Sequence, residues 1–140
     1  MKYIIFSIYF LTSFCVFGQK NSDNRIIISF SDTSNLYEKV RLALINEDFM
    51  VKGDKKNDTL STFPLNIQGN SFMIIYASIK KNVIELWGYL GYSNNNLMGI
   101  TINPSKKDYK KIFYYKRDKY WKKMHSIAMR LNGDIYYNSK

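Results

Sequence analysis

Two neighbouring apolar runs, residues 72–79 and 83–90, constrain the fold of this chain more than any other feature. Only residues 80–82 separate them, which is the length of a tight turn, and Asn82 in that turn tolerates a positive φ. Both runs carry apolar side chains on both faces of an alternating pattern, and such strands belong at the centre of a covered sheet. The sequence therefore predicts a central antiparallel hairpin, with Trp87 as a core residue in its middle.

An amphipathic helix is predicted ahead of this hairpin, over residues 35–47. Polar residues at 31–35 supply candidate N-cap side chains. Lys39 and Arg41 fall away from the apolar stripe, as expected of a helix with one side in solvent. The apolar positions recur at helical spacing and share one face; they are Leu36, Val40, Ala43 and Leu44.

Shorter apolar runs predict the remaining strands of one mainly antiparallel sheet. Pro64 has no backbone donor, so the strand before it should end there or lie at a sheet edge. These predicted strands are residues 25–30, 49–52, 59–63 and 97–103.

The C-terminal segment admits two interpretations. As one long helix from Asp108, it has an apolar stripe that Lys116 and Arg117 interrupt. If residues 112–116 instead form a strand and Asp118 caps a helix, the apolar face of that helix is unbroken. We favour the second interpretation, with Asn132-Gly133 as the helix stop and residues 134–138 as a last strand. The unbroken face consists of Tyr120, Met124, Ile127, Ala128 and Leu131.

These elements predict an α+β fold in which two helices pack on one mainly antiparallel sheet as a two-layer sandwich. The predicted order is β-α-β-β-β-β-β-β-α-β. Residues 25–140 suit a single domain with one hydrophobic core, and residues 19–24 read as a flexible leader.

The first eighteen residues read as a secretory signal peptide. Lys2 precedes an apolar run over residues 3–17, which is shorter than the roughly 20 residues needed to span a bilayer. Val16-Phe17-Gly18 is a suitable context for cleavage before Gln19, so we expect an exported protein without a membrane span after cleavage. The alternatives are an uncleaved membrane segment and a lipid anchor on Cys15.

The chain resembles a loose set of small exported proteins of Gram-negative bacteria that have no assigned activity. The resemblance rests on the signal that ends before Gln19, the passage LINEDFMVKGDKKNDTLSTFP, the hairpin FMIIYASIKKNVIELWGYLG and the helix end LNGDIYY. Asp48 stands where these proteins usually have a small residue. The resemblance implies an α+β domain in the periplasm or outside the cell, and it gives no residue a role.

Residues that could support catalysis stand alone in this sequence. His125 is the only histidine, and no HExxH or GxSxG pattern accompanies it, so we interpret it as exposed and non-catalytic. Glu85 lies between apolar strand residues, where burial would make it a candidate general acid. The favoured alternative is that this sheet face is partly solvated, or that Glu85 pairs with a lysine from Lys80, Lys81 or the basic segment.

Metal and cofactor sites are not predicted either. Asp54 and Asp58 flank two lysines, whose charge opposes a calcium loop. Cys15 is the only cysteine and lies in the predicted signal, so the mature chain has no thiolate ligand and no disulfide. No cofactor is expected.

The basic segment, residues 106–123, is the sharpest local signal in a chain of formal net charge +10. It holds nine Lys or Arg residues against Asp108 and Asp118, interleaved with aromatic residues. Such a pattern is typical of surfaces that follow phosphates while rings stack on bases or sugars. The alternative is a solvated helix face whose aromatics belong to the core. The candidate polyanion-binding residues are Lys110, Lys111, Lys116, Arg117, Lys119, Lys122 and Lys123.

The leading functional hypothesis is therefore a non-catalytic exported protein that acts as an envelope-accessory or binding module. The second is a cationic binder of envelope polyanions, such as a glycan, lipopolysaccharide or nucleic acid, through residues 106–123. A small secreted hydrolase is third. Candidate partners are envelope polyanions or another envelope protein. The sequence has no RNP pattern or zinc knuckle, which argues against sequence-specific nucleic-acid recognition.

Overall fold

The computed structural model describes residues 19–54, 58–93, 96–97, 100–101 and 108–139. The predicted signal peptide, with Cys15, and most of the predicted strand at 97–103 lie outside these residues. Within the described part of the chain, no helix has the length and apolar character that crossing a membrane requires.

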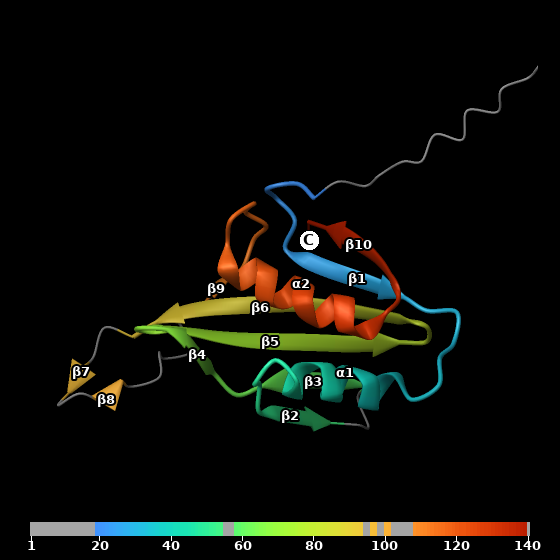
Figure 1. Cartoon of the computed structure of the whole chain (residues 1–140), viewed down its shortest axis with the longest axis horizontal. Helices are drawn as coiled ribbons and strands as arrows, with labels where there is room; N and C mark the ends of the chain where they lie inside the picture. The colour runs from blue at the N-terminus through green and yellow to red at the C-terminus, as the bar shows by residue number, and fades with distance from the viewer. Residues whose placement is uncertain (1–18, 55–57, 94–95, 98–99, 102–107, 140) are drawn as a thin grey trace, which may run out of the picture.

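The structure is an α+β fold, as predicted, with two helices on one face of an antiparallel sheet (Figure 1). Strands in the order β10-β1-β6-β5-β3-β2 form the main path, β4 pairs with β5, and β9 pairs with β6. Strands β7 and β8 pair only with each other. The elements are β1 (Arg25–Ser29), α1 (Leu36–Ile45), β2 (Val51–Asp54), β3 (Thr59–Thr62), β4 (Leu65–Gln68), β5 (Ser71–Lys80), β6 (Val83–Tyr92), β7 (Asn96–Leu97), β8 (Ile100–Thr101), β9 (Lys110–Lys111), α2 (Lys119–Leu131) and β10 (Asp134–Asn138).

The predicted central hairpin is confirmed as β5 and β6, which pair from Ser71 opposite Tyr92 to Lys80 opposite Val83. The turn differs from the prediction, because Lys81 and not Asn82 takes the positive φ, of 53°. Asn82 instead joins the hairpin to the end of β1. The Phe30 N–H donates to the Asn82 carbonyl at 2.9 Å, and the Asn82 side-chain amide donates to the Phe30 carbonyl at 3.2 Å.

Trp87 was expected in the core, and the structure places it elsewhere. The helices cover only one face of β5 and β6, where Met73, Ile75, Ile84 and Leu86 are fully buried. Because successive side chains of a strand point to opposite faces, Trp87 lies on the opposite face from Leu86, where it is half-buried. The apolar pattern on both faces was misleading because ring-to-ring packing across strands, and not a second layer of helices, shields this face.

Both predicted helices are confirmed, and the second interpretation of the C-terminal segment is the correct one. The buried residues of α1 are the four predicted ones. Helix α2 begins after Asp118, whose side chain accepts a hydrogen bond from the Tyr120 N–H at 2.8 Å, and it ends at Asn132 in the left-handed conformation. Its buried face holds all five predicted residues and also Trp121.

The strand expected at residues 112–116 is wrong in position: β9 is Lys110–Lys111, and the chain then leaves the sheet. Ile112 makes the last sheet bond, to the Gly88 carbonyl at 2.9 Å, and its side chain packs over Gly88 beside Met124. A Cβ at residue 88 would lie 2.9 Å from Ile112 Cδ1 and from Met124 Sδ, so any larger residue there would displace these two side chains. The Tyr114 N–H then bonds to the Asp23 carbonyl at 2.7 Å, which directs residues 115–118 toward one end of the molecule.

Candidate polyanion-binding surface

Five of the seven predicted binding residues are exposed on consecutive elements at one end of the sheet, where β9 leads into α2 (Figure 1). Lys119 and Lys122 are three residues apart and therefore neighbours on the surface of α2. The Lys119 ammonium donates to the Gln68 side-chain oxygen and lies 4.9 Å from the ring centroid of Tyr120. Among the described residues, these five cations make no ion pair within 4.0 Å. We call this surface the basic end; it consists of Lys110, Lys116, Arg117, Lys119 and Lys122.

Aromatic side chains are exposed among these cations. Along the segment that follows β9, Ile112 and Tyr114 turn inward, and Tyr114 meets Trp121 edge-on at 5.7 Å between ring centroids. The alternation leaves Phe113 and Tyr115 outward, with 49% and 67% of their surface exposed. The core therefore accounts for Tyr120 and Trp121 but not for these two rings, which can stack on a ligand.

Tyr92 belongs to the same end of the molecule. Burial raises the pKa of its hydroxyl, and the neighbouring Tyr120 hydroxyl and Asp118 carboxylate raise it further. Its ring nevertheless stays largely exposed. Tyr92 was not among the predicted site residues, because its position at the end of β6 gave no signal of proximity to α2.

The other two predicted residues, Lys111 and Lys123, are not part of the basic end. Lys111 is half-buried on β9 opposite Tyr89 and interacts with a neighbouring residue. Lys123 is half-buried on the flank of α2 that faces α1, where its Nζ pairs with Glu47 at 2.9 Å and with Asp48 at 3.9 Å. Its charge is thus largely compensated within the fold.

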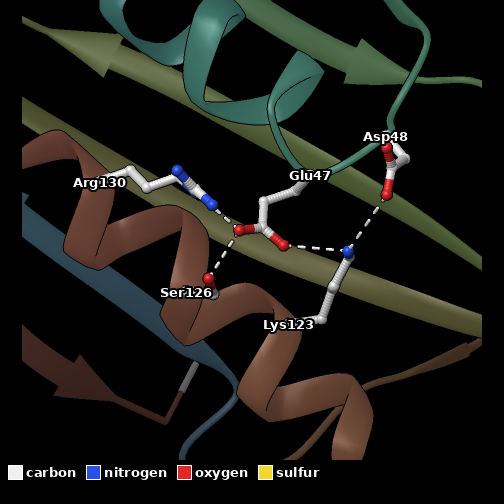
Figure 2. Close-up of polar contacts among 5 residues, drawn as sticks. All are labelled: Glu47, Asp48, Lys123, Ser126 and Arg130. Atoms are coloured by element: carbon white, nitrogen blue, oxygen red, sulfur yellow. Dashed lines mark hydrogen bonds and ion pairs between the residues drawn. The ribbon is translucent and has the colours of Figure 1, made fainter.

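Glu47 is the centre of a polar cluster that joins the two helices (Figure 2). Its Oε1 accepts hydrogen bonds from the Ser126 hydroxyl and from Arg130 Nε, both at 2.7 Å, while Oε2 pairs with Lys123. Burial of the carboxylate opposes ionisation, but these three donors outweigh it and lower its pKa from 4.5 to about 2. The sequence analysis missed Glu47. The only signal was the spacing of Lys123, Ser126 and Arg130, which places three donors on one helix flank.

The candidate catalytic residues do not meet. Glu85 lies on the sheet face without helices and pairs with Arg25 at 2.5 Å, whereas the expected partner was a lysine. His125 lies on α2, on the other side of the sheet, where its Nδ1 is 3.2 Å from the Tyr137 hydroxyl. It is half-buried and not exposed as expected. Asp58 is exposed, and no group of three potential metal ligands occurs in the described part of the chain.

A hollow of about 620 Å³ lies between the end of β1 and the ends of α1 and α2. Its walls carry charges of both signs, including Lys39 and Arg130 with Asp32 and Asp134, and the serine hydroxyls of Ser29 and Ser31. No histidine or cysteine lines it.

No protein-family model matches the chain, and no curated protein matches it. What the fold and the surface define is a small single-domain α+β protein that carries, at one end, exposed rings and cations without an ion pair to any described residue.

Proposed function

We propose that this protein is an exported, non-catalytic binding module of the Gram-negative cell envelope, periplasmic or extracellular, that binds polyanions through the basic end. One observation carries the proposal: five exposed cations without an ion pair stand beside the exposed rings of Phe113 and Tyr115. The export half of the proposal rests on the apolar N-terminal run before Gln19 and on the resemblance to small exported proteins.

Cations that are ion-paired within the fold and cations that are not contribute differently to polyanion binding. A cation already paired with a carboxylate gains little from a second anion, whereas an unpaired exposed one releases counterions when a polyanion binds. The five cations come from residues 110–122 and therefore act on one stretch of ligand. Phe113 and Tyr115 add ring faces for sugars or bases, which need no defined sequence.

A hydrolase has no comparable support. Glu85 and His125 lie on opposite sides of the sheet, and each is engaged by its own neighbour, Arg25 or Tyr137. General acid–base catalysis needs two groups that reach one substrate, and these two do not.

The proposal is tested by measuring the affinity of residues 19–140 for single-stranded DNA, heparin and lipopolysaccharide over a range of salt concentrations. The combined substitutions Lys116→Gln, Arg117→Gln and Lys122→Gln should reduce the salt slope for DNA by roughly 2, since three of the contacting charges are lost. The matched control for the DNA titration replaces Lys52, Lys80 and Lys81 by Gln, which removes the same charge from exposed residues that have no ion pair with a described residue and lie away from the basic end.

Two results would contradict the proposal. If both triple variants lose the same affinity, general basicity explains binding and the basic end is not a site. If the unmodified protein does not bind any of the three polyanions at about 0.15 M salt, where charges are screened beyond roughly 8 Å, the cations are only a solvated surface.

A further inference from the structure

A single row of side chains crosses the sheet face that carries neither described helix. Strand pairing places Asn138 opposite Arg25, Trp87 opposite Tyr76, Tyr76 opposite Ser61, and Ser61 opposite Lys52. The guanidinium of Arg25 lies 5.0 Å from the ring centroid of Trp87, which joins the two halves of the row. From β10 to β2, the row reads Asn138, Arg25, Trp87, Tyr76, Ser61 and Lys52.

The middle of this row is a stack of flat groups. Arg25 lies over Trp87, and the rings of Trp87 and Tyr76 are nearly parallel, at 10°, with centroids 5.7 Å apart. Glu85 holds Arg25 by an ion pair of 2.5 Å, and Tyr89 meets Tyr76 edge-on at 5.6 Å. These contacts fix the ring of Tyr76 before any ligand arrives, which reduces the entropy lost on binding.

The stack stops at Tyr76 because the next position in the row is Ser61, whose side chain is too short to continue it. A hollow of about 450 Å³ lies there, bounded by the rings of Tyr76 and Trp87, the hydroxyl residues Thr59 and Ser61, and Lys52. Lys52 is two strand spacings from Tyr76, or about 9.6 Å, which leaves room for one ring between them. We call this hollow the slot.

Lys52 forms the far wall of the slot and sets its charge. Its Nζ lies 5.0 Å from the ring centroid of Phe63, which holds the side chain at the rim. Lys52 makes no ion pair with any described residue, and the carboxylate of Glu85 is already paired with Arg25. The slot therefore presents a net positive charge opposite an aromatic wall.

We propose that the slot binds one acidic pyranose ring, such as a hexuronate residue of an anionic glycan. A pyranose has an apolar C–H face that stacks on Tyr76 and polar edges that meet Thr59 and Ser61, while its carboxylate pairs with Lys52. The Ser61 hydroxyl already donates to the Lys52 carbonyl at 3.3 Å, so its oxygen is left to accept a hydrogen bond from a sugar hydroxyl, which a purely aromatic ring does not carry. The slot lies on a different surface from the basic end, so this inference does not depend on the proposed function.

The test is calorimetric titration of residues 19–140 with a short oligogalacturonate and with a neutral galactan fragment of the same length. Ser61→Tyr fills the slot with a ring. Added to the triple variant of the basic end, it should abolish the remaining oligogalacturonate binding without lowering the melting temperature further, because tyrosine suits a half-buried strand position on an open sheet face. Lys52→Gln should weaken oligogalacturonate binding about tenfold, the loss expected for one charge-assisted hydrogen bond at a partly exposed site. Lys80→Gln, on the same strand face but away from the slot, is the matched control and should bind like the unmodified protein.

The triple variant of the basic end should bind oligogalacturonate with unchanged stoichiometry at the slot, which separates this inference from the proposed function. The inference is overturned if Ser61→Tyr, added to that triple variant, leaves its oligogalacturonate binding unchanged. It is also overturned if the neutral fragment binds as tightly as the acidic one, or if an aromatic carboxylate binds and neither sugar does.

Discussion

Helix α2 carries two groups of cations that look alike in sequence and differ in the fold. Lys123 and Arg130, on the flank that faces α1, share one buried carboxylate, that of Glu47. Lys122 points away from that flank, while Lys119 lies on it one turn before Lys123 and donates to the Gln68 side-chain oxygen; neither has an ion pair with any described residue. The cations of a basic helix therefore have to be sorted into those that pair with a carboxylate of the fold and those that do not, before any of them is assigned to ligand binding.

The division has a physical origin. A buried carboxylate is stable only when donors satisfy it, so Glu47 fixes the positions of Lys123, Ser126 and Arg130 and joins α1 to α2. Exposed cations need no partner in the fold because water solvates them, and their ion pairs contribute little to stability. We therefore expect substitutions on the inner side of α2 to lower the free energy of unfolding, and those at the basic end to change binding.

The largest effect should come from the buried face of α2. Trp121→Ala removes a side chain that is only 2% exposed and packs against Tyr114 and Tyr137, so it should cost about 3 to 5 kcal/mol of unfolding free energy. Trp87→Ala, on the open sheet face, should cost markedly less. Urea midpoints at equal slopes give the comparison, and equal losses would mean that the core has been assigned to the wrong tryptophan.

Glu47→Gln should have the next largest effect. The substitution keeps the shape of the side chain and removes the charge that Lys123 and Arg130 share, so we expect a loss of about 1 to 3 kcal/mol. Asp48→Asn is the matched control, because Asp48 is exposed and its contact with Lys123 is 3.9 Å long. Its cost should stay below about 0.5 kcal/mol. Equal costs at the two positions would show that burial of Glu47 has no energetic role.

The same carboxylate predicts how stability depends on pH. The pKa of Glu47 is lowered from 4.5 to about 2 in the folded protein, so its contribution is fully present above pH 4.5 and is lost as the pH falls toward 2. The stability difference between the unmodified protein and Glu47→Gln should therefore shrink over that interval. Urea midpoints at a series of pH values measure this difference, and a difference that stays constant would rule out the ionised cluster.

Much of the fold could be predicted from the sequence because its signals are local. The spacing of Leu36, Val40, Ala43 and Leu44 defines the buried face of α1, and Asp118 and Asn132 mark the ends of α2. Strand β4 was missed because it is short, follows Pro64 and has no fully buried residue. Trp87 was wrongly expected in the core because apolar residues on both faces of a strand do not tell whether one face or both are covered.

The candidate site was less predictable because pairing is not local. The sequence identifies all seven cations, but Glu47, which compensates Lys123, lies 79 residues before Ser126 and joins the cluster only in the fold. Arg25 likewise reaches Glu85 through the pairing of β1 with β6. The slot at Ser61 depends on the register of four strands, which no single run of sequence contains.

The most direct measurement of the central claim compares the two groups of α2 cations in the salt dependence of single-stranded DNA binding. Lys119→Gln with Lys122→Gln should lower the slope by about 1 to 2 and leave the melting temperature nearly unchanged, because these exposed cations contact the ligand. Lys123→Gln with Arg130→Gln should lower the melting temperature and leave the slope as it is, because Glu47 already compensates this charge. If the two double variants change the slope equally, pairing within the fold does not decide which cations bind, and the account is contradicted.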